Sequence, residues 1–398
     1  MSEIPTKSQI EELFGRYVDT IFPSLEKAVE LLSSGKPLTF YLGIDPTGPD
    51  IHLGHTTNLL VLKKLIKLGH KVILLMGDFT AQTGDPTGKD STRKVLDNEQ
   101  VLKNMETYLD QVNKILEKDS YVVRHNSEWL AGLTFAEIRK LARHITVQQT
   151  ITRDMFQKRL AEGKAITLEE FLYPLMQGYD SVAMAVDGEI GGTDQTFNMM
   201  MGRDLVGAIL GKEKIVITTR LLEDPETKKK IMNKSEGSYV SLNDSANEMF
   251  GKAMALSDSA ILPILTYCTE VSLEKVNDLA ERLKNGENPK VLKEEMAKEL
   301  VKMYYGPEPA EAAVENFTKV FSKGGLPDDI LELANCAGQS IVDLIFNNKL
   351  ALSRSEAKRL IEQGGVKIDE QTVSDWDQTV KVGEVIKIGA RRFVKVVS

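Results

Sequence analysis

Residues 38–55 read LTFYLGIDPTGPDIHLGH, and this stretch decides how the first half of the chain is expected to fold. Residues 38–44 form an apolar run with the length of a buried strand, and the Asp-Pro and Gly-Pro pairs that follow favour a turn. Helical spacing then covers residues 54–69, with Gly69 as a stop signal. The stretch therefore predicts a strand, a turn and a helix that begins at a pair of histidines, His52 and His55.

The same alternation of strand and helix continues along the chain. After an N-terminal helical stretch that ends near residue 36, further strands are expected at KVILLMG (71–77), YVVRHN (121–126), SVAMAVDGEIGG (181–192) and KIVITT (214–219). Helices are expected around 98–117 and over 195–210. This pattern predicts an α/β fold, a Rossmann-like doubly wound parallel sheet, whose ligands bind beyond the carboxyl ends of the strands.

The remainder of the chain changes character twice. Strand signals stop at about residue 240, and amphipathic helices follow over 241–325. Residues 326–339 are expected to be a linker, and residues 340–398 a small α+β module with ten Lys and Arg against eight Asp and Glu. We therefore expect three parts: residues 1–240, 241–325 and 340–398.

Composition limits the class of protein. The 398 residues are 42% hydrophobic and 27% charged, and no stretch approaches the ~20 apolar residues of a membrane span. The N-terminus has no signal-peptide or transit character, and the two cysteines suit a reducing compartment, so a cytoplasmic protein is expected. The net charge of −8 argues against nucleic-acid binding over the whole surface, but not against a local basic site.

The two histidines allow three interpretations. A metal site would need a third ligand, and no other His or Cys stands near them in sequence, so no metal site is predicted. Helix packing and phosphate binding stay open, because a helix N-terminus attracts anions and Gly54 lets a ligand approach the backbone closely.

Three other motifs follow predicted strands or lie on a predicted helix. GDPTGKDST (84–92) is not a P-loop, but its Asp85 could meet an ammonium group; an exposed turn is the alternative. YPLMQGYD (173–180) places Tyr173, Gln177 and Asp180 on one helix face, which is either a pocket wall or an exposed face. In GGTDQTFN (191–198), Asp194 could accept hydrogen bonds from ribose hydroxyls, and the alternative is that it caps the next helix.

The basic run KKKIMNKSEGS (228–238) follows the last predicted strand. Most lysine runs are solvated surface, but a phosphate role is an option at this position. In this order the motifs are specific, and the set resembles the bacterial tyrosyl-tRNA synthetases of the class I aminoacyl-tRNA synthetase family. HLGH resembles the HIGH motif of that family, and IMNKS (231–235) takes the place of its KMSKS loop, with Ile231 and Asn233 as departures.

The resemblance implies an enzyme that activates L-tyrosine with ATP and transfers it to the 3'-terminal ribose of its tRNA. Catalysis is implied for His52, His55, Lys234 and Lys230. Tyrosine binding is implied for Tyr41, Thr80, Asp85, Tyr173, Gln177, Asp180 and Gln195. ATP binding is implied for Gly43, Asp45, His52, His55, Gly192, Asp194, Lys234 and Ser235. ATP is expected as a substrate that carries Mg²⁺, and no tightly bound cofactor is expected.

The resemblance also extends to partners. The tail resembles an S-four-type RNA-binding domain, and a homodimer is implied through an insertion near residues 125–160. RNA contacts are expected from Lys349, Arg354, Lys358, Arg359, Arg391 and Arg392. The alternatives are a tryptophan–tRNA ligase, a small-molecule nucleotidyltransferase with the same histidine pair, and an inactive synthetase-like RNA-binding protein.

Overall fold

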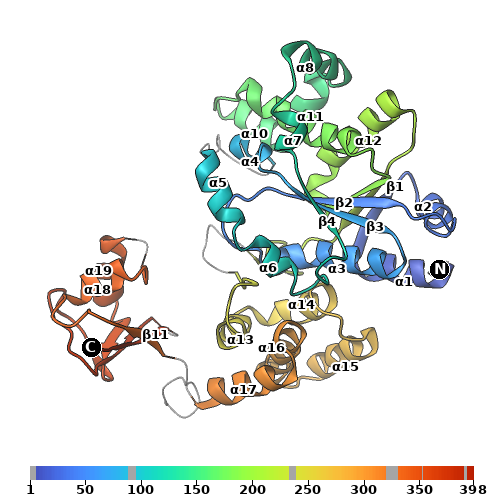
Figure 1. Ribbon diagram of the computed structural model, residues 1–398. Helices are drawn as coiled ribbons and strands as arrows, with labels where there is room; N and C mark the ends of the chain where they lie inside the picture. The colour runs from blue at the N-terminus through green and yellow to red at the C-terminus, as the bar shows by residue number, and fades with distance from the viewer. Residues whose placement is uncertain (1–5, 88–95, 233–238, 320–329, 352, 390–391) are drawn as a thin grey trace. The chain divides into compact units, whose positions relative to one another are not determined.

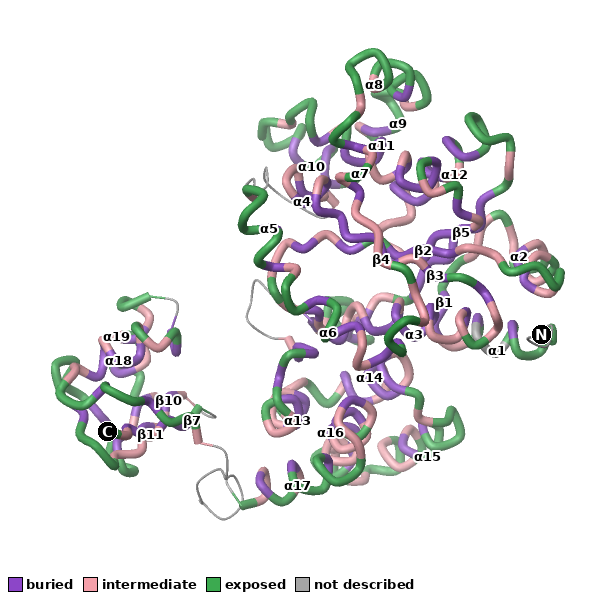
Figure 2. Tube along the Cα trace, in the orientation of Figure 1, coloured by how far each residue is buried: buried purple, intermediate pink, exposed green. Residues whose placement is uncertain are grey.

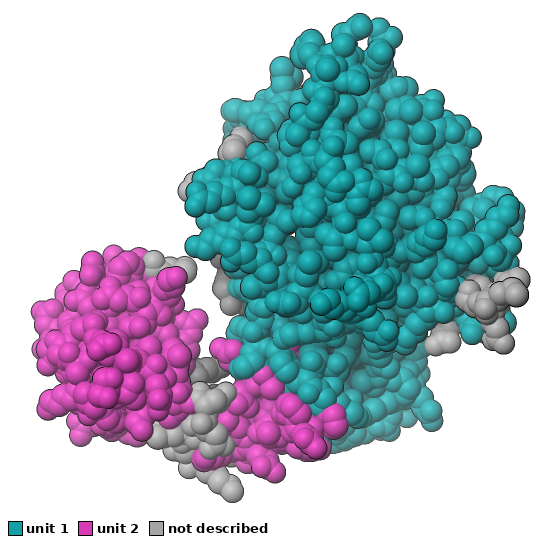
Figure 3. All heavy atoms as spheres, viewed as in Figure 1, with its two compact units in different colours: residues 1–245, 252–306 teal, residues 246–251, 307–398 magenta. Residues whose placement is uncertain are grey.

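The computed structural model describes residues 6–87, 96–232, 239–319, 330–351, 353–389 and 392–398. The chain divides into two compact units: residues 1–245 with 252–306, and residues 246–251 with 307–398 (Figure 3). Each unit is described by itself. No helix among the described residues is long and apolar enough to span a membrane.

A six-stranded sheet organises the first unit, in the order β1-β6-β5-β2-β3-β4. Its strands are β1 (Val18–Phe22), β2 (Thr39–Ile44), β3 (Lys71–Met76), β4 (Val122–His125), β5 (Gly188–Gly192) and β6 (Ile215–Thr219). The five strands from β6 to β4 are parallel, which confirms the doubly wound sheet. Buried residues concentrate along the central strands (Figure 2).

Helices cover both faces of this sheet. Figure 1 shows α1 (Lys7–Tyr17) and α3 (Leu53–Lys67) on one face, with α11 (Leu168–Ala183) and α12 (Thr196–Leu210) on the other. The direction in which strands are added to the sheet reverses between β2 and β5, because β3 and β4 extend the sheet to one side of β2 and β6 lies on the other side, beyond β5. The carboxyl ends of β2 and β5 are therefore the topological switch point, where ligands of such sheets bind.

Further helices complete the first unit. They are α2 (Leu25–Leu32), α4 (Thr80–Thr83), α5 (Asn98–Met105), α6 (Tyr108–Val112), α7 (Ser127–Leu130), α8 (Phe135–Leu141), α9 (Val147–Ile151), α10 (Asp154–Ala161), α14 (Ile261–Tyr267), α15 (Leu273–Lys284) and α16 (Pro289–Tyr305). α13 (Ala246–Met254) spans the division between the units. The described part of 241–319 is helical and contains no named strand, as expected from its amphipathic pattern.

Three local predictions were wrong. β1 lies inside the predicted N-terminal helical stretch and pairs antiparallel with β6 at the sheet edge. Residues 181–187 belong to the end of α11 and a turn, so the strand begins only at Gly188. The helix expected over 98–117 is broken into α5 and α6, because Asn104, Tyr108 and Gln111 turn toward the loop after β2 and donate to the carbonyls of Pro46, Gly48 and Pro49.

The second unit ends in a small α+β module. It contains α17 (Pro307–Phe317), β7 (Leu331–Leu333), α18 (Ile341–Asn347), α19 (Arg354–Glu362), β8 (Val366–Ile368), β9 (Gln371–Thr372), β10 (Val385–Ile388) and β11 (Arg392–Val396). The strands form one sheet in the order β7-β11-β10-β8-β9 over an apolar core of its own. β7 lies within the segment expected to be a linker. Ser353 caps α19, and its Oγ accepts from the Glu356 amide at 3.1 Å.

Candidate active site

The histidine pair lies at the first turn of α3. His52 is the N-cap residue, and its Nδ1 accepts from the Gly54 amide at 3.1 Å. The two ring centroids lie 4.1 Å apart. His52 Nδ1 faces a backbone N–H group, so the neutral His52 ring carries its proton on Nε2. His55 Nδ1 lies 3.3 Å from both the amide and the carbonyl of His52, so either ring nitrogen of His55 can hold the proton. Both rings lie beside the positive end of a 15-residue helix.

Gly54 is required by this arrangement. A Cβ at this position would lie 2.9 Å from His52 Cε1 and 3.0 Å from its Nδ1. The close approach of the His52 ring to the helix backbone therefore depends on a residue without a side chain.

Asp45 lies beyond the carboxyl end of β2 and joins two helices. Its carboxylate accepts from Thr80 Oγ1 on α4 at 2.8 Å and from the Tyr173 hydroxyl on α11 at 2.8 Å. Burial raises the pKa of Tyr173 well above its ordinary value, and Asp45 raises it further. Asp45 was expected to bind ATP, whereas Thr80 and Tyr173 were expected to bind tyrosine. The structure therefore brings a residue expected at the ATP site into direct contact with two residues expected at the tyrosine site.

Two of the expected polar side chains are almost completely buried. Tyr41 on β2 is 0% exposed and Asp180 on α11 is 2% exposed. The Tyr41 hydroxyl lies 3.0 Å from Ser181 Oγ, whereas Asp180 accepts from Trp129 Nε1 at 2.8 Å and from Asn126 Nδ2 at 3.3 Å. Burial raises the pKa of Asp180 well above its ordinary value, although both hydrogen bonds act to lower it.

Two more expected residues meet across a long sequence separation. Gln195 Nε2 donates to Asp85 Oδ2 at 2.6 Å, and the other Asp85 oxygen accepts from the Thr87 amide and hydroxyl. On α11, Gln177 Nε2 donates to Glu189 Oε1 on β5 at 3.0 Å. The loops after β3 and β5 and the polar face of α11 therefore converge.

The ribose candidate and a lysine candidate form an ion pair. Lys230 Nζ lies 2.8 Å from Asp194 Oδ2, and both side chains are partly exposed. Gly192 precedes Asp194 at the end of β5, and a Cβ there would lie 2.7 Å from Asp194 Oδ1. Lys234 and Ser235 lie outside the described residues. The preceding Met232 is buried, and its sulfur accepts from the Val240 amide at 3.4 Å.

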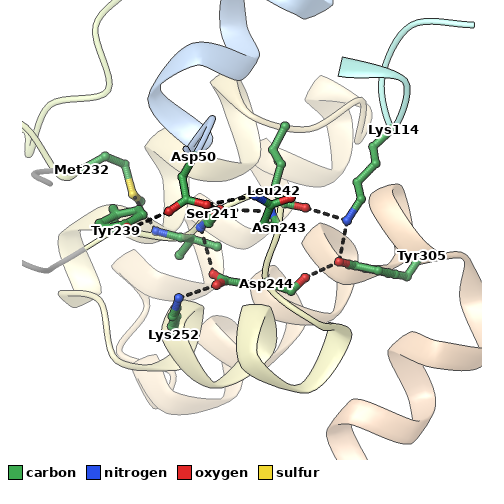
Figure 4. Close-up of polar contacts among 11 residues, drawn as sticks. Asp50, Lys114, Met232, Tyr239, Ser241, Leu242, Asn243, Asp244, Lys252 and Tyr305 are labelled. Carbon is green, nitrogen blue, oxygen red and sulfur yellow. Dashed lines mark hydrogen bonds and ion pairs between the residues drawn. The ribbon is translucent and has the colours of Figure 1, made fainter. Parts of the chain in front are cut away.

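The chain after the 228–238 run is attached beside the histidine pair, and Figure 4 shows its polar contacts with Asp50. The Leu53 amide donates to the Val240 carbonyl at 3.1 Å, and the Leu242 amide donates to the Ile51 carbonyl at 2.8 Å. The Asp50 carboxylate accepts from the Tyr239, Ser241 and Asn243 side chains at 2.9, 3.0 and 3.0 Å. We call residues 239–244 with Asp50 the loop anchor.

Further contacts hold the loop anchor from its other side. Lys114 Nζ donates to the Leu242 carbonyl at 2.5 Å and to the Tyr305 hydroxyl at 2.7 Å. Asp244 Oδ2 accepts from the Ser241 amide at 2.8 Å and pairs with Lys252 through its other oxygen. Figure 4 shows Lys114, just after α6, Lys252 on α13 and Tyr305 on α16 converging on the segment.

The tail residues expected to contact RNA have varied surroundings. Lys349 is exposed, and Arg354 pairs with Asp343 at 2.8 Å on the surface. Lys358 lies over the Trp376 ring with Nζ 4.4 Å from its centroid, and exposed Arg359 follows on α19. Arg392 Nη1 donates to the Leu350 carbonyl at 2.6 Å. Arg391 lies outside the described residues.

Sequence reasoning missed several residues of this site. Trp129 and Asn126 contact Asp180, and Asp50 supports the loop anchor, yet none of them stands in a recognised motif. Glu189 and Lys214 form a fully buried ion pair next to the pocket. One signal was present for these last two, because each places a charge in an apolar stretch predicted to be a buried strand.

Comparison with known proteins gives consistent results. Residues 33–322 match the family described as tRNA synthetases class I (W and Y), and residues 340–386 match the S4 domain. The chain is 43% identical to the tyrosine–tRNA ligase of Carboxydothermus hydrogenoformans, with 97% of both chains covered. It is 44% identical to that of Francisella tularensis, with 94% of both chains covered.

Solved structures share the fold. A C-terminally truncated mitochondrial tyrosyl-tRNA synthetase from Aspergillus nidulans has a TM-score of 0.64 at 22% identity, over 79% of this chain and 94% of that one. The Archaeoglobus fulgidus tyrosyl-tRNA synthetase, solved with L-tyrosine, has a TM-score of 0.60 at 22% identity, over 78% of this chain and 100% of that one.

Proposed function

The chain belongs to the class I tRNA synthetases as a tyrosine–tRNA ligase, and we propose that the residues at its topological switch point carry out the reaction as set out below. The enzyme joins L-tyrosine to its tRNA at the expense of ATP. The relatives decide for tyrosine over the tryptophan alternative. The observation that carries the proposed residue roles is the burial of two polar side chains, Tyr41 on β2 and Asp180 on α11.

In the first step, the carboxylate of tyrosine attacks the α-phosphate of ATP, and pyrophosphate leaves. No covalent enzyme intermediate is needed, so the site acts by alignment and by stabilising phosphate charge. The ring N–H groups of His52 and His55 would donate to phosphate oxygens at the α3 N-terminus. Removal of one such donor costs about 3 kcal/mol in other enzymes that stabilise developing negative charge.

The rest of the pocket would orient tyrosine. Tyr41 and Asp180 bind its phenolic hydroxyl at the deep end. Four side chains surround its ammonium group, namely Asp85, Thr80, Tyr173 and Gln177. Gln195, which donates to Asp85, helps to position the tyrosine, and these contacts support the assignment. Gly43, Asp45 and Gly192 lie along the ATP side. The substrate hydroxyl would give each of these two buried polar groups a further hydrogen-bond partner, which phenylalanine cannot do.

The nucleotide side would require a local exchange of partners. Asp194 is paired with Lys230 in the structure, and ATP would separate them. The ribose hydroxyls would then donate to Asp194, while Lys230, Lys234 and Ser235 reach the phosphates. This exchange is compatible with the departures at Ile231 and Asn233, because Lys230 already lies beside the nucleotide side. Mg²⁺ would enter on the ATP phosphates, its usual ligands in such sites.

In the second step, tyrosine passes to the terminal ribose of tRNA. We propose that residues 340–398, which contain the S4 match, bind the tRNA through Lys349, Arg354, Lys358, Arg359, Arg391 and Arg392. Residues 1–240 would provide catalysis and 241–325 would support the anticodon side of the tRNA. We further propose that the enzyme acts in the cytoplasm, where its tRNA substrate is found.

We also propose a homodimer. Large apolar side chains of α8 to α11 are strongly exposed, which is unusual for a monomer surface. Phe135 is 84% exposed and Leu168 is 80% exposed, and Val147 and Leu160 add 60% and 48%. The same region contains the segment 125–160 in which the interface was expected, so a second copy of the chain is the proposed partner.

The decisive experiment is ATP–pyrophosphate exchange with tyrosine, tryptophan or phenylalanine, on the wild type and on Lys234→Ala. Exchange with tyrosine alone, strongly reduced in the variant, is expected. Loss of residues 340–398 should leave this exchange intact and reduce tRNA charging. No exchange with any amino acid would identify an inactive synthetase fold, and equal loss of exchange and charging on truncation would contradict the proposed division of labour.

A further inference from the structure

A fully buried ion pair lies behind the tyrosine pocket and has no role in the mechanism above. Lys214, just before β6, and Glu189 on β5 have side chains that are 0% and 3% exposed. Burying two charges costs several kcal/mol per ion, and well-packed apolar residues often serve stability equally well. The position of the pair, next to Tyr41 and Gln177, suggests that it acts on substrate recognition.

The Lys214 ammonium group uses all three of its hydrogens. It pairs with Glu189 Oε2, donates to Ser181 Oγ at 2.7 Å and donates to the Met199 carbonyl at 3.2 Å. An ammonium group can only donate, so Ser181 Oγ accepts in this contact. The proton of Ser181 can then be donated to the Tyr41 oxygen, which lies 3.0 Å away.

Glu189 is the competing acceptor for the Tyr41 proton. Burial raises the pKa of Tyr41 well above its ordinary value, and the nearby Glu189 carboxylate raises it further. In the structure both Glu189 oxygens are engaged, Oε1 by Gln177 and Oε2 by Lys214. Lys214 therefore has two effects. It pairs with Glu189, the carboxylate that competes for the Tyr41 proton, and through Ser181 it supplies a hydrogen-bond donor to the Tyr41 oxygen.

Room for the lysine head group is provided by a glycine. A Cβ at Gly202 on α12 would overlap Lys214 Nζ and would lie 2.8 Å from Ser181 Oγ and 3.4 Å from Glu189 Oε2. The Lys214 Nζ also lies 5.7 Å from the centroid of the Tyr41 ring. The ammonium group is thus enclosed between α11, α12 and the sheet.

We propose that Lys214 is a positioning residue for substrate selection: it keeps the hydroxyl proton of Tyr41 free to be donated to the phenolic oxygen of tyrosine. Asp180 then accepts the proton of the substrate hydroxyl, so the substrate must both accept and donate. This inference rests on the proposed role of Tyr41 and Asp180.

The test uses Lys214→Met in the full-length protein, with Lys212→Met as the matched control. Lys212 lies two residues away and forms a partly exposed pair with Asp187 at 3.0 Å. In the Lys214 variant Glu189 would capture the Tyr41 proton. The KM for tyrosine in pyrophosphate exchange should rise about three- to tenfold, the effect of one lost neutral hydrogen bond, while the KM for ATP stays unchanged.

Phenylalanine separates this role from structural damage. Phenylalanine has no hydroxyl to accept from Tyr41, so its kcat/KM should not change in Lys214→Met, and discrimination should fall by the same factor. The double variant Lys214→Met/Glu189→Gln removes the competing charge and should recover much of the tyrosine KM. A parallel loss for both amino acids, or a double variant no better than the single one, would overturn the proposal.

Two further variants keep the test decisive. Ser181→Ala should raise the KM for tyrosine in the same way, and an unchanged KM would overturn the proposal even if Lys214→Met failed to fold. Tyr41→Phe tests the underlying pocket. If it leaves tyrosine selection unchanged, the proposed function of the pocket fails; if it impairs selection while the Lys214 and Ser181 variants do not, only this inference fails.

Discussion

The loop anchor gives a prediction whose size can be worked out from contacts. Asp50→Ala removes one carboxylate that accepts three side-chain hydrogen bonds, from Tyr239, Ser241 and Asn243. Hydrogen bonds to charged groups contribute about 1.5–3 kcal/mol each, but these three share one partly exposed acceptor and are not additive. We therefore expect about 2–4 kcal/mol of lost anchoring, since the backbone contacts of Leu53 and Leu242 remain.

Such a loss should appear as local opening. It corresponds to a roughly 30- to 700-fold increase in the opening equilibrium of residues 239–244. Hydrogen exchange at the Leu242 amide, which donates to Ile51 at 2.8 Å, measures that equilibrium directly. Because this segment directly follows the basic run 228–238, which is proposed to contact the ATP phosphates, kcat should fall while the KM for tyrosine stays unchanged.

A nearby carboxylate provides the control. Asp110→Ala on α6 removes an exposed aspartate, and exchange at Leu242 should stay at the wild-type rate. If Asp50→Ala also leaves Leu242 exchange unchanged, the contribution assigned to Asp50 is wrong. If exchange accelerates equally throughout the first unit, the aspartate stabilises the whole unit and not the loop anchor.

Two further predictions concern stability and assembly. Arg159→Leu leaves Glu170 buried without its partner, now 2.5 Å away, and should lower the free energy of unfolding by about 3–5 kcal/mol at pH 7 in urea titrations. Burial acts to raise the pKa of Glu170, but hydrogen bonds from Arg159 and Thr167 outweigh it and hold the pKa below its ordinary value. The wild type therefore has this extra stability above the pKa of Glu170 in the unfolded chain, and it loses that stability as pH falls through the pKa in the folded protein. The stability deficit of the variant should shrink toward about pH 4, and a deficit independent of pH would contradict this reasoning. Phe135→Glu with Leu168→Glu should convert the proposed dimer to a monomer in sedimentation velocity, whereas Val382→Glu, at a position 57% exposed, should not; a dimer in both variants would exclude that surface.

Periodicity predicted the parallel part of the sheet because buried parallel strands are continuous apolar runs. The same rule failed for β1, whose VDTIF stretch has mixed burial and gains its strand conformation only from β6, about two hundred residues away. The broken helix over 98–117 has the same kind of cause. Its break depends on side-chain bonds to the loop after β2, which local spacing cannot indicate.

The site divides along a similar line. The expected residues Asp45 and Thr80 meet because they follow strands that end at one edge of the sheet, and Tyr173 on α11 reaches the same Asp45 carboxylate. Lys214 and Glu189 were not predicted, since a charge within an apolar run is ambiguous until the partner is known. Contacts of this type are decided by packing in three dimensions and not by spacing along the chain.

The pairing of β1 with β6 has a consequence for synthesis on the ribosome. Val18 pairs with Thr219, so the first strand of the sheet leaves the ribosome long before its partner strand β6 exists. At about 5–20 residues per second, the delay is roughly 10–40 s. During that time β1 and the free edge of β2, which awaits β5, present unpaired backbone groups to other chains. Nascent chains halted shortly before residue 215 should therefore depend on chaperone protection more strongly than chains halted after residue 245.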